Sequence, residues 1–161
     1  MGQTDVPDVA RILLPVLARV DERDRPLLLA IAERMAAERY RSWAGAAANG
    51  YDRDRLLACA DREDEIASRV EALRPDHEDV QARIHQTVPD LAGLTRNVFE
   101  PHPWQTQFAI QAQGERLGAA TWRALAPLQS TAEAREAMLE CARLEEASAQ
   151  VLESILAEHR V

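Results

Sequence analysis

Apolar residues recur along the chain at spacings of three and four, in long segments separated by short breaks rich in Asp, Asn, Gly and Pro. This spacing places the apolar side chains on one face of an α-helix. The pattern predicts a short amphipathic helix followed by four long helices. The expected ranges are 8–20 for the short helix and 25–48, 54–73, 104–125 and 131–158 for the long ones.

Residues in the breaks predict where the helices begin and end. Asp24 can cap the first long helix, and Asn49-Gly50 is expected to end it. Ser130 and Glu133 have the spacing of a capping box at the start of the last helix. The links within each pair of long helices are short, so each pair is expected to form an antiparallel hairpin.

The segment between the two hairpins differs from the rest. Its apolar positions predict one amphipathic helix interrupted by Pro89, and Pro101 and Pro103 close the segment. We interpret residues 76–106 as a long crossover that carries some helix. The chain then divides into a tail with a short helix, residues 1–24, and one four-helix bundle, residues 25–161.

The two hairpins match each other at an offset of 82 residues without a gap. The matching halves cover residues 25–75 and 107–158 approximately. The matched residues are Glu33 and Glu115, Arg34 and Arg116, Ala37 and Ala119, Tyr40 and Trp122, Arg41 and Arg123, Ala44 and Ala126, Cys59-Ala60 and Cys141-Ala142, Glu63 and Glu145, Asp64 and Glu146, Ala67 and Ala149, and Glu71 and Glu153. A matched Cys-Ala pair together with a matched aromatic position favours a true internal repeat over chance similarity.

Composition and charge narrow the function classes. The 161 residues are 47% hydrophobic and only 4% aromatic, which suits one helical domain with its own core. The net charge is −8, and the 19 basic residues, all arginine, are scattered, so we expect no nucleic-acid partner. The longest apolar stretch near the N-terminus, residues 12–17, is too short to span a bilayer. We therefore expect a cytoplasmic protein with no membrane partner.

Each long helix carries one glutamate at a position that the apolar spacing assigns to the core: Glu33, Glu63, Glu115 and Glu145. Ionised carboxylates about 5 Å apart, at an effective dielectric near 20, repel by about 3 kcal/mol for each pair. Desolvation adds to this cost. Two divalent cations would neutralise four carboxylates, and such hard oxygen ligands suit Mn, Fe(II), Mg or Ca. The four glutamates are therefore candidate metal ligands.

With these glutamates, the repeat and the crossover, residues 25–158 resemble the ferritin-like superfamily, which includes rubrerythrins and ferritin-type di-iron proteins. The resemblance implies an all-α four-helix bundle with one long crossover. In that family two helices carry one Glu each and the other two carry Glu-x-x-His. An aromatic residue two turns after the first Glu is also typical, and Tyr40 and Trp122 have that place. The resemblance implies two bound iron or manganese ions and oxidoreductase-like chemistry.

The chain departs from this family pattern at both histidines. Ile66 stands three residues after Glu63, and Ser148 stands three residues after Glu145. Ile66 has no ligand atom, and Ser148 is at best a weak ligand, which argues against di-iron redox and ferroxidase chemistry. One interpretation is a ferritin-like protein with a remnant or altered carboxylate di-metal site. The alternative is a metal-free ferritin-like binding or scaffold protein without catalysis.

In the metal-free alternative, nearby arginines are expected to pair with the glutamates: Arg34, Arg62, Arg116 or Arg143. Cys59 and Cys141 are interpreted as buried, reduced thiols. For Tyr40 and Trp122 we expect core packing, with a redox relay as the alternative. His85 is expected at the surface, although the crossover could carry it inward. The acids Asp64, Glu71, Glu146 and Glu153 are expected in solvent, and the short N-terminal helix is a candidate homodimer element.

Overall fold

The computed structural model describes residues 6–159, so the first five residues of the expected N-terminal tail lie outside the described range. Residues 6–159 form α-helices and two 3-10 turns and contain no β-strand, which confirms the all-helical prediction. The helices are α1 (Val9–Leu17), α2 (Arg25–Ala46), α3 (Gly50–Ala72), α4 (His77–Thr87), α5 (Leu91–Phe99), α6 (Trp104–Leu125) and α7 (Ala132–Glu158).

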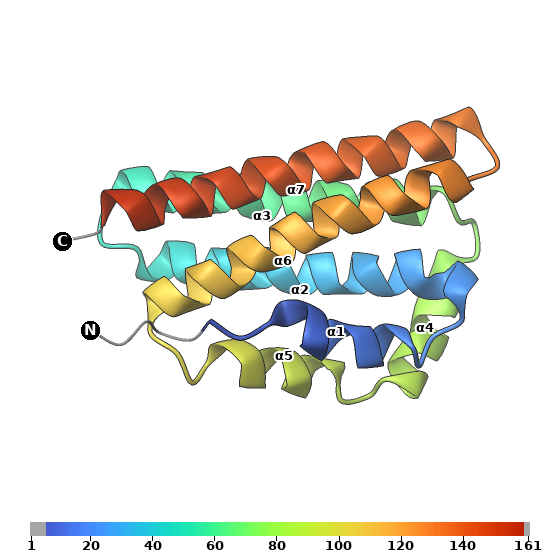
Figure 1. Ribbon diagram of the computed structural model, residues 1–161, viewed down its shortest axis with the longest axis horizontal. Helices are drawn as coiled ribbons and strands as arrows, with labels where there is room; N and C mark the ends of the chain where they lie inside the picture. The colour runs from blue at the N-terminus through green and yellow to red at the C-terminus, as the bar shows by residue number, and fades with distance from the viewer. Residues whose placement is uncertain (1–5, 160–161) are drawn as a thin grey trace.

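The four long helices form two packed hairpins. α2 packs along α3, α6 packs along α7, and α3 and α7 connect the hairpins side by side. The backbones of α2 and α6 approach each other less closely than those of α3 and α7. α1 and α5 lie on the open side of α2 and α6, away from α3 and α7, and α4 closes one end (Figure 1). The expected crossover therefore consists of α4 and α5, separated at Pro89.

Ion pairs between neighbouring helices connect both hairpins. Arg34 on α2 pairs with Glu71 and Asp64 on α3, and Arg41 also pairs with Asp64. In the second hairpin, Arg116 on α6 pairs with Glu153 on α7, and Arg123 pairs with Glu146. These four acids lie outside the buried glutamate group, as expected: Glu153 is exposed, and Asp64, Glu71 and Glu146 are partly exposed. The sequence interpretation did not include their arginine partners on the facing helix. The pairs are partly exposed, so each contributes at most about 1 kcal/mol.

The capping residues differ from the predictions at three helix ends. Asn49 does not end α2; its Oδ1 accepts from the backbone N–H of Asp52 at 2.8 Å, so α3 begins at Gly50. Thr131, not Ser130, caps α7, and its Oγ1 accepts from the backbone N–H of Ala134 at 3.1 Å. The Asp24 side chain makes no capping bond and instead accepts from Arg74 at 3.3 Å.

The buried apolar residues form two clusters, one on each side of the glutamate level. One contains residues such as Ile31, Ile66 and Met138, and the other contains Tyr40, Leu56, Phe108 and Leu152. Glu33, Glu63, Glu115 and Glu145 lie between them along their helices. The bundle therefore has a polar layer enclosed by two apolar ones.

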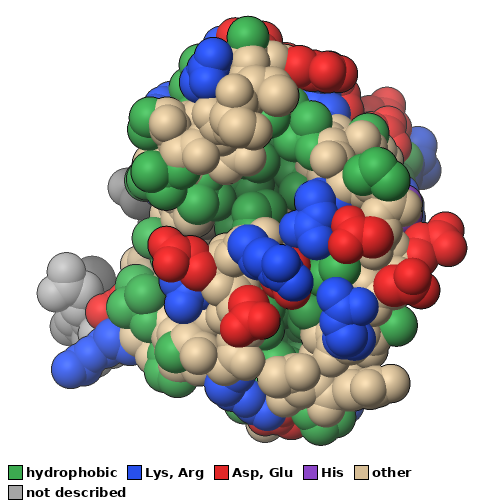
Figure 2. All heavy atoms as spheres, turned by 90° about the vertical axis from the view of Figure 1, so that its right-hand side faces the viewer, with side chains coloured by type: hydrophobic (Ala, Val, Ile, Leu, Met, Phe, Trp, Pro, Cys, Tyr) green, Lys and Arg blue, Asp and Glu red, His purple; other side chains and the backbone are tan. Residues whose placement is uncertain are grey.

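The described surface mixes charges of both signs. At the end that carries the turn between α6 and α7, arginine and acidic side chains lie close together beside a recessed apolar area (Figure 2). None of the described helices is long and apolar enough to cross a membrane.

Candidate metal centre

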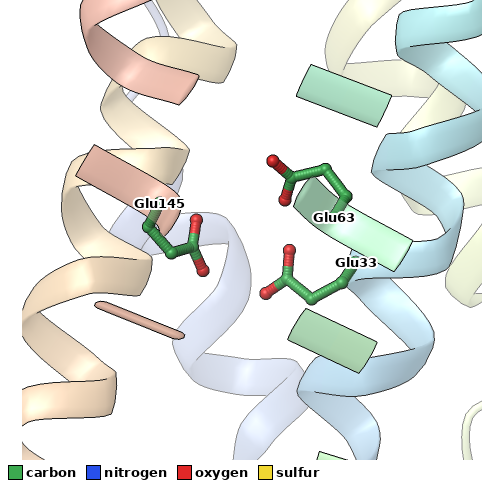
Figure 3. Close-up of side chains that lie close together, drawn as sticks. All are labelled: Glu33, Glu63 and Glu145. Carbon is green, nitrogen blue, oxygen red and sulfur yellow. The ribbon is translucent and has the colours of Figure 1, made fainter. Parts of the chain in front are cut away.

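Three of the four candidate glutamates converge in the middle of the bundle. Glu33 comes from α2, Glu63 from α3 and Glu145 from α7, and one carboxylate oxygen of each lies within 4.8 Å of the others. Figure 3 shows the three carboxylates pointing toward one another from separate helices. Glu63 and Glu145 are fully buried, whereas Glu33 is partly accessible. Three helices from both hairpins thus bring their carboxylates to one point.

Glu115, the fourth candidate, lies beside this group on α6 and is also buried. Its Oε1 accepts hydrogen bonds from the Tyr40 hydroxyl at 2.6 Å and from Gln111 Nε2 at 2.7 Å. Glu115 lines the same cavity as Glu33 and Glu145. The structure therefore places three predicted ligands together and the fourth next to them.

Side chains of the bundle hold two further carboxylates in place. Ser148 Oγ donates to Glu63 Oε1 at 2.8 Å, and Trp122 Nε1 donates to Glu145 Oε1 at 2.8 Å. Glu63 Oε2 and Glu115 Oε2 are buried and have no hydrogen-bond partner among the described residues. A buried carboxylate oxygen without a partner costs about 1–3 kcal/mol or more. A cation or a proton at these oxygens would remove that cost, so the residues present fit a metal site.

Burial also changes the proton affinity of the group. Burial, followed by the neighbouring Glu115 carboxylate, raises the pKa of Glu33 to about 7. Burial together with the nearby carboxylates raises the pKa values of Glu63 and Glu145 well above their usual range. The metal-free site therefore holds protons near neutral pH, and a metal ion must displace them to bind.

The two positions that depart from the family pattern have separate roles. Ile66 is fully buried in one apolar cluster and supplies no ligand atom. The Ser148 hydroxyl reaches across from α7 to Glu63 on α3 and supplies a hydrogen bond. Tyr40 and Trp122 are buried in the core, as expected from their spacing, and each also donates to a glutamate. These carboxylate contacts were not evident from the sequence.

The arginines proposed as partners for the glutamates have other contacts. Arg34 and Arg116 pair with the surface acids of their own hairpins, Arg143 pairs with Glu136 and Glu140, and Arg62 contacts Cys59. In the metal-free interpretation these four arginines therefore do not neutralise the buried glutamates. Protonation of the carboxylates can still neutralise them.

Arg39 is the cation that the sequence interpretation missed. Its Nε donates to Gln111 Oε1 at 3.0 Å, and its guanidinium carbon lies 4.0 Å from the centre of the Phe99 ring. Burial lowers the pKa of Arg39 to about 10. This role could not be predicted from the sequence, since a residue 100° around the helix from Tyr40 is expected at the bundle's flank.

Gly118 provides the space that the Glu145 carboxylate occupies. A methyl group added to Gly118 would lie 2.4 Å from Glu145 Oε1 and 2.6 Å from its Cδ. Glycine inside a helix costs about 1 kcal/mol relative to alanine. A glycine one turn after Glu115 could therefore have indicated, from the sequence, that another side chain packs closely against α6 at the site.

The remaining candidate residues are consistent with structural roles. Cys59 and Cys141 are free and buried, as predicted. Burial raises the pKa of Cys59 to about 11 and that of Cys141 to about 12, so neither is a ready nucleophile. His85 is exposed on α4 and does not reach the core, which confirms the surface interpretation.

No protein-family model matches the chain, and neither a curated protein nor a solved structure matches it. The functional argument for this chain therefore depends on its own residues and geometry.

Proposed function

We propose that this chain is a ferritin-like protein in which Glu33, Glu63, Glu115 and Glu145 hold two divalent metal ions, iron or manganese, in an altered carboxylate site. The observation that carries the proposal is the convergence of Glu33, Glu63 and Glu145 within 4.8 Å, combined with unpaired buried oxygens on Glu63 and Glu115. Carboxylates buried in this way require neutralisation, and two divalent ions match four of them in charge.

The ferritin-like relation is supported by the order of the elements and by repeated contacts. Two hairpins are joined by a crossover containing α4 and α5, which is the connection of ferritin-type bundles. Arg34 with Glu71 and Arg116 with Glu153 are equivalent pairs at the offset of 82 residues. The second equivalent set is Arg41 with Asp64 and Arg123 with Glu146. These contacts support descent of both hairpins from one repeated unit.

The ligand set determines which chemistry is reasonable. Carboxylate oxygens without imidazole favour hard ions such as Mn(II) and, among redox metals, Fe(II). Iron(II) in such a centre would supply electrons for reduction of dioxygen or peroxide. The chain's own contribution is to orient the ligands: Tyr40 and Gln111 hold Glu115, Trp122 holds Glu145, and Ser148 holds Glu63. α1 and α5 cover the open side of the bundle.

A metal-free binding or scaffold protein is the second candidate, and one observation favours it. Burial raises the pKa of Glu33 to about 7, and burial also raises the pKa values of Glu63 and Glu145 well above their usual range. Protonated carboxyl groups can form a stable polar layer without a metal. In this candidate, which we also place in the cytoplasm, the bundle would bind a partner and would not catalyse a reaction.

Metal uptake distinguishes the two candidates. The purified protein is dialysed against Mn(II) at neutral pH, and bound manganese is counted by elemental analysis. We expect about two ions for each chain, matching the four carboxylates, and loss of both in a Glu63→Gln/Glu145→Gln variant. Glu153→Gln is the matched control, because Glu153 lies on α7 but pairs with Arg116 at the surface. No uptake by the parent protein, with the double variant as stable as the parent or more so, would establish the metal-free candidate.

A further inference from the structure

A cavity of about 270 Å³ lies between α1 and α5 on one side and α2 and α6 on the other. It exists because α2 and α6 are set apart and present small side chains to the space between them. Its walls are mainly apolar, and they include Leu13, Leu17, Leu94, Val98, Ala36 and Ile110. Gly114 also lines it, and a methyl group added there would meet no atom within 4 Å.

The cavity also has charged residues in its lining. Glu33, Glu115 and Glu145 are among the residues that line it, and so is Arg39. Within residues 6–159, the Arg39 side chain makes a hydrogen bond only through Nε, to Gln111. Its two terminal nitrogens therefore have no hydrogen-bond partner among these residues.

Charge indicates what these charged residues would attract. Two divalent ions would cancel the charge of the four glutamates and leave the single positive charge of Arg39. An apolar cavity whose lining includes one unneutralised guanidinium is complementary to an amphipathic anion. Arginine binds carboxylates through two parallel N–H donors, which suits a carboxylate head group.

We propose that the cavity binds a straight-chain aliphatic carboxylate, with its head group on Arg39 beside the metal centre and its chain between α1 and α5. This inference rests on the proposed metal centre, because the metal ions supply the neutralisation. At about 30 Å³ for each water-sized group, the cavity holds about nine such groups, which corresponds to a chain of about eight carbons.

The test is calorimetric titration of the Mn(II)-loaded protein with octanoate, butyrate and octan-1-ol. We expect octanoate to bind most tightly. Each buried methylene group contributes about a fourfold gain in affinity, so butyrate, which lacks four of them, should bind about 250-fold more weakly. Octan-1-ol has the same chain but lacks the charge, so it should bind at least about tenfold more weakly than octanoate.

Two variants separate the head-group contact from the apolar contact. Arg39→Met keeps an unbranched side chain over Phe99 and removes the charge, so octanoate affinity should fall to that of octan-1-ol while octan-1-ol affinity is unchanged. Gly114→Leu fills the cavity and should weaken octanoate and octan-1-ol together by at least about tenfold. Gly45→Leu is the matched control, since Gly45 is an exposed helical glycine with no atom near the added side chain, and it should change neither affinity.

The outcomes for the ligand and for the metal can be distinguished. If the protein holds manganese but binds octanoate no better than butyrate or octan-1-ol, the ligand inference is overturned and the metal centre stands. If the protein takes up no manganese, the proposed metal centre is wrong. If octanoate then still binds, and both Arg39→Met and Gly114→Leu weaken its binding, the result would support the cavity assignment alone. Absence of both metal and octanoate binding would overturn both proposals.

Discussion

Replacement of Gly118 by alanine tests whether the Glu145 carboxylate is held at a functional position. The added methyl carbon would lie 2.4 Å from Glu145 Oε1, whereas nonbonded contact begins at about 3.5 Å. The carboxylate must therefore move by about 1 Å. Its hydrogen bond from Trp122 Nε1, now 2.8 Å, would then exceed the normal range.

The size of the effect follows from these contacts. Losing a buried hydrogen bond to a carboxylate costs about 1–3 kcal/mol, while alanine in a helix gains about 1 kcal/mol over glycine. Gly114→Ala, one turn earlier on α6, also replaces a helical glycine by alanine, but its added methyl group meets no atom within 4 Å. This variant should therefore keep the full gain of about 1 kcal/mol. The free energies of unfolding of the two metal-free variants should therefore differ by about 1–3 kcal/mol, with Gly118→Ala the less stable.

Metal affinity gives the second readout. A displaced Glu145 carboxylate no longer meets the other ligands, and disturbing the support of a ligand typically weakens binding by about 10–100-fold. Urea denaturation without metal and equilibrium dialysis against Mn(II) measure the two effects on Gly118→Ala, Gly114→Ala and the parent. Equal stability and equal manganese affinity for the two glycine variants would refute the claim that Gly118 makes room for a metal ligand.

Other predictions concern protons, hydrogen bonds, surface charges and assembly. The pKa of Glu33 is raised from 4.5 to about 7 in the folded protein. Between these two pH values the folded metal-free protein therefore binds more protons than the unfolded chain. Its free energy of unfolding should fall by about 3 kcal/mol as the pH rises from below 4.5 to above 7. Urea denaturation in chelator between pH 5 and 8 should show this slope, and Glu33→Gln should remove its contribution. Ser148→Ala should destabilise the metal-free form by about 1–3 kcal/mol because it removes the donor to Glu63; an unchanged melting temperature would contradict that contact. Arg116→Ala should cost less than about 1 kcal/mol in urea denaturation, because its pair with Glu153 is partly exposed, and a larger loss would show a structural role not evident from the ion pair. Sedimentation checks the predicted homodimer through α1, and a monomer at micromolar concentration would count against it.

The number and order of the long helices were predictable because they depend on local periodicity. Stripes such as Ala30, Glu33, Ala37 and Tyr40 repeat at helical spacing, and packing of the four long helices follows that pattern. Boundaries were less predictable, since they depend on which side chain reaches a free N–H. Asn49 and Thr131 make that contact in the structure, and Ser130 does not.

The candidate site was predictable as a set of residues but not as an arrangement. The sequence placed four glutamates in the core, and the structure groups three of them. Glu115 lies beside that group, and its carboxylate accepts hydrogen bonds from Tyr40 and Gln111. Arg39 could not be identified in advance, because its helical position faces the flank until α5 covers that side with Phe99.

The sequence by itself determined an all-helical chain with one glutamate at the core level of each long helix, because both properties follow from residue spacing along a helix. Tertiary structure alone decided which carboxylates meet, which of their oxygens lack a partner, and that Arg39 helps to line an apolar cavity. These features depend on distances between helices far apart in the sequence, and no local pattern specifies those distances.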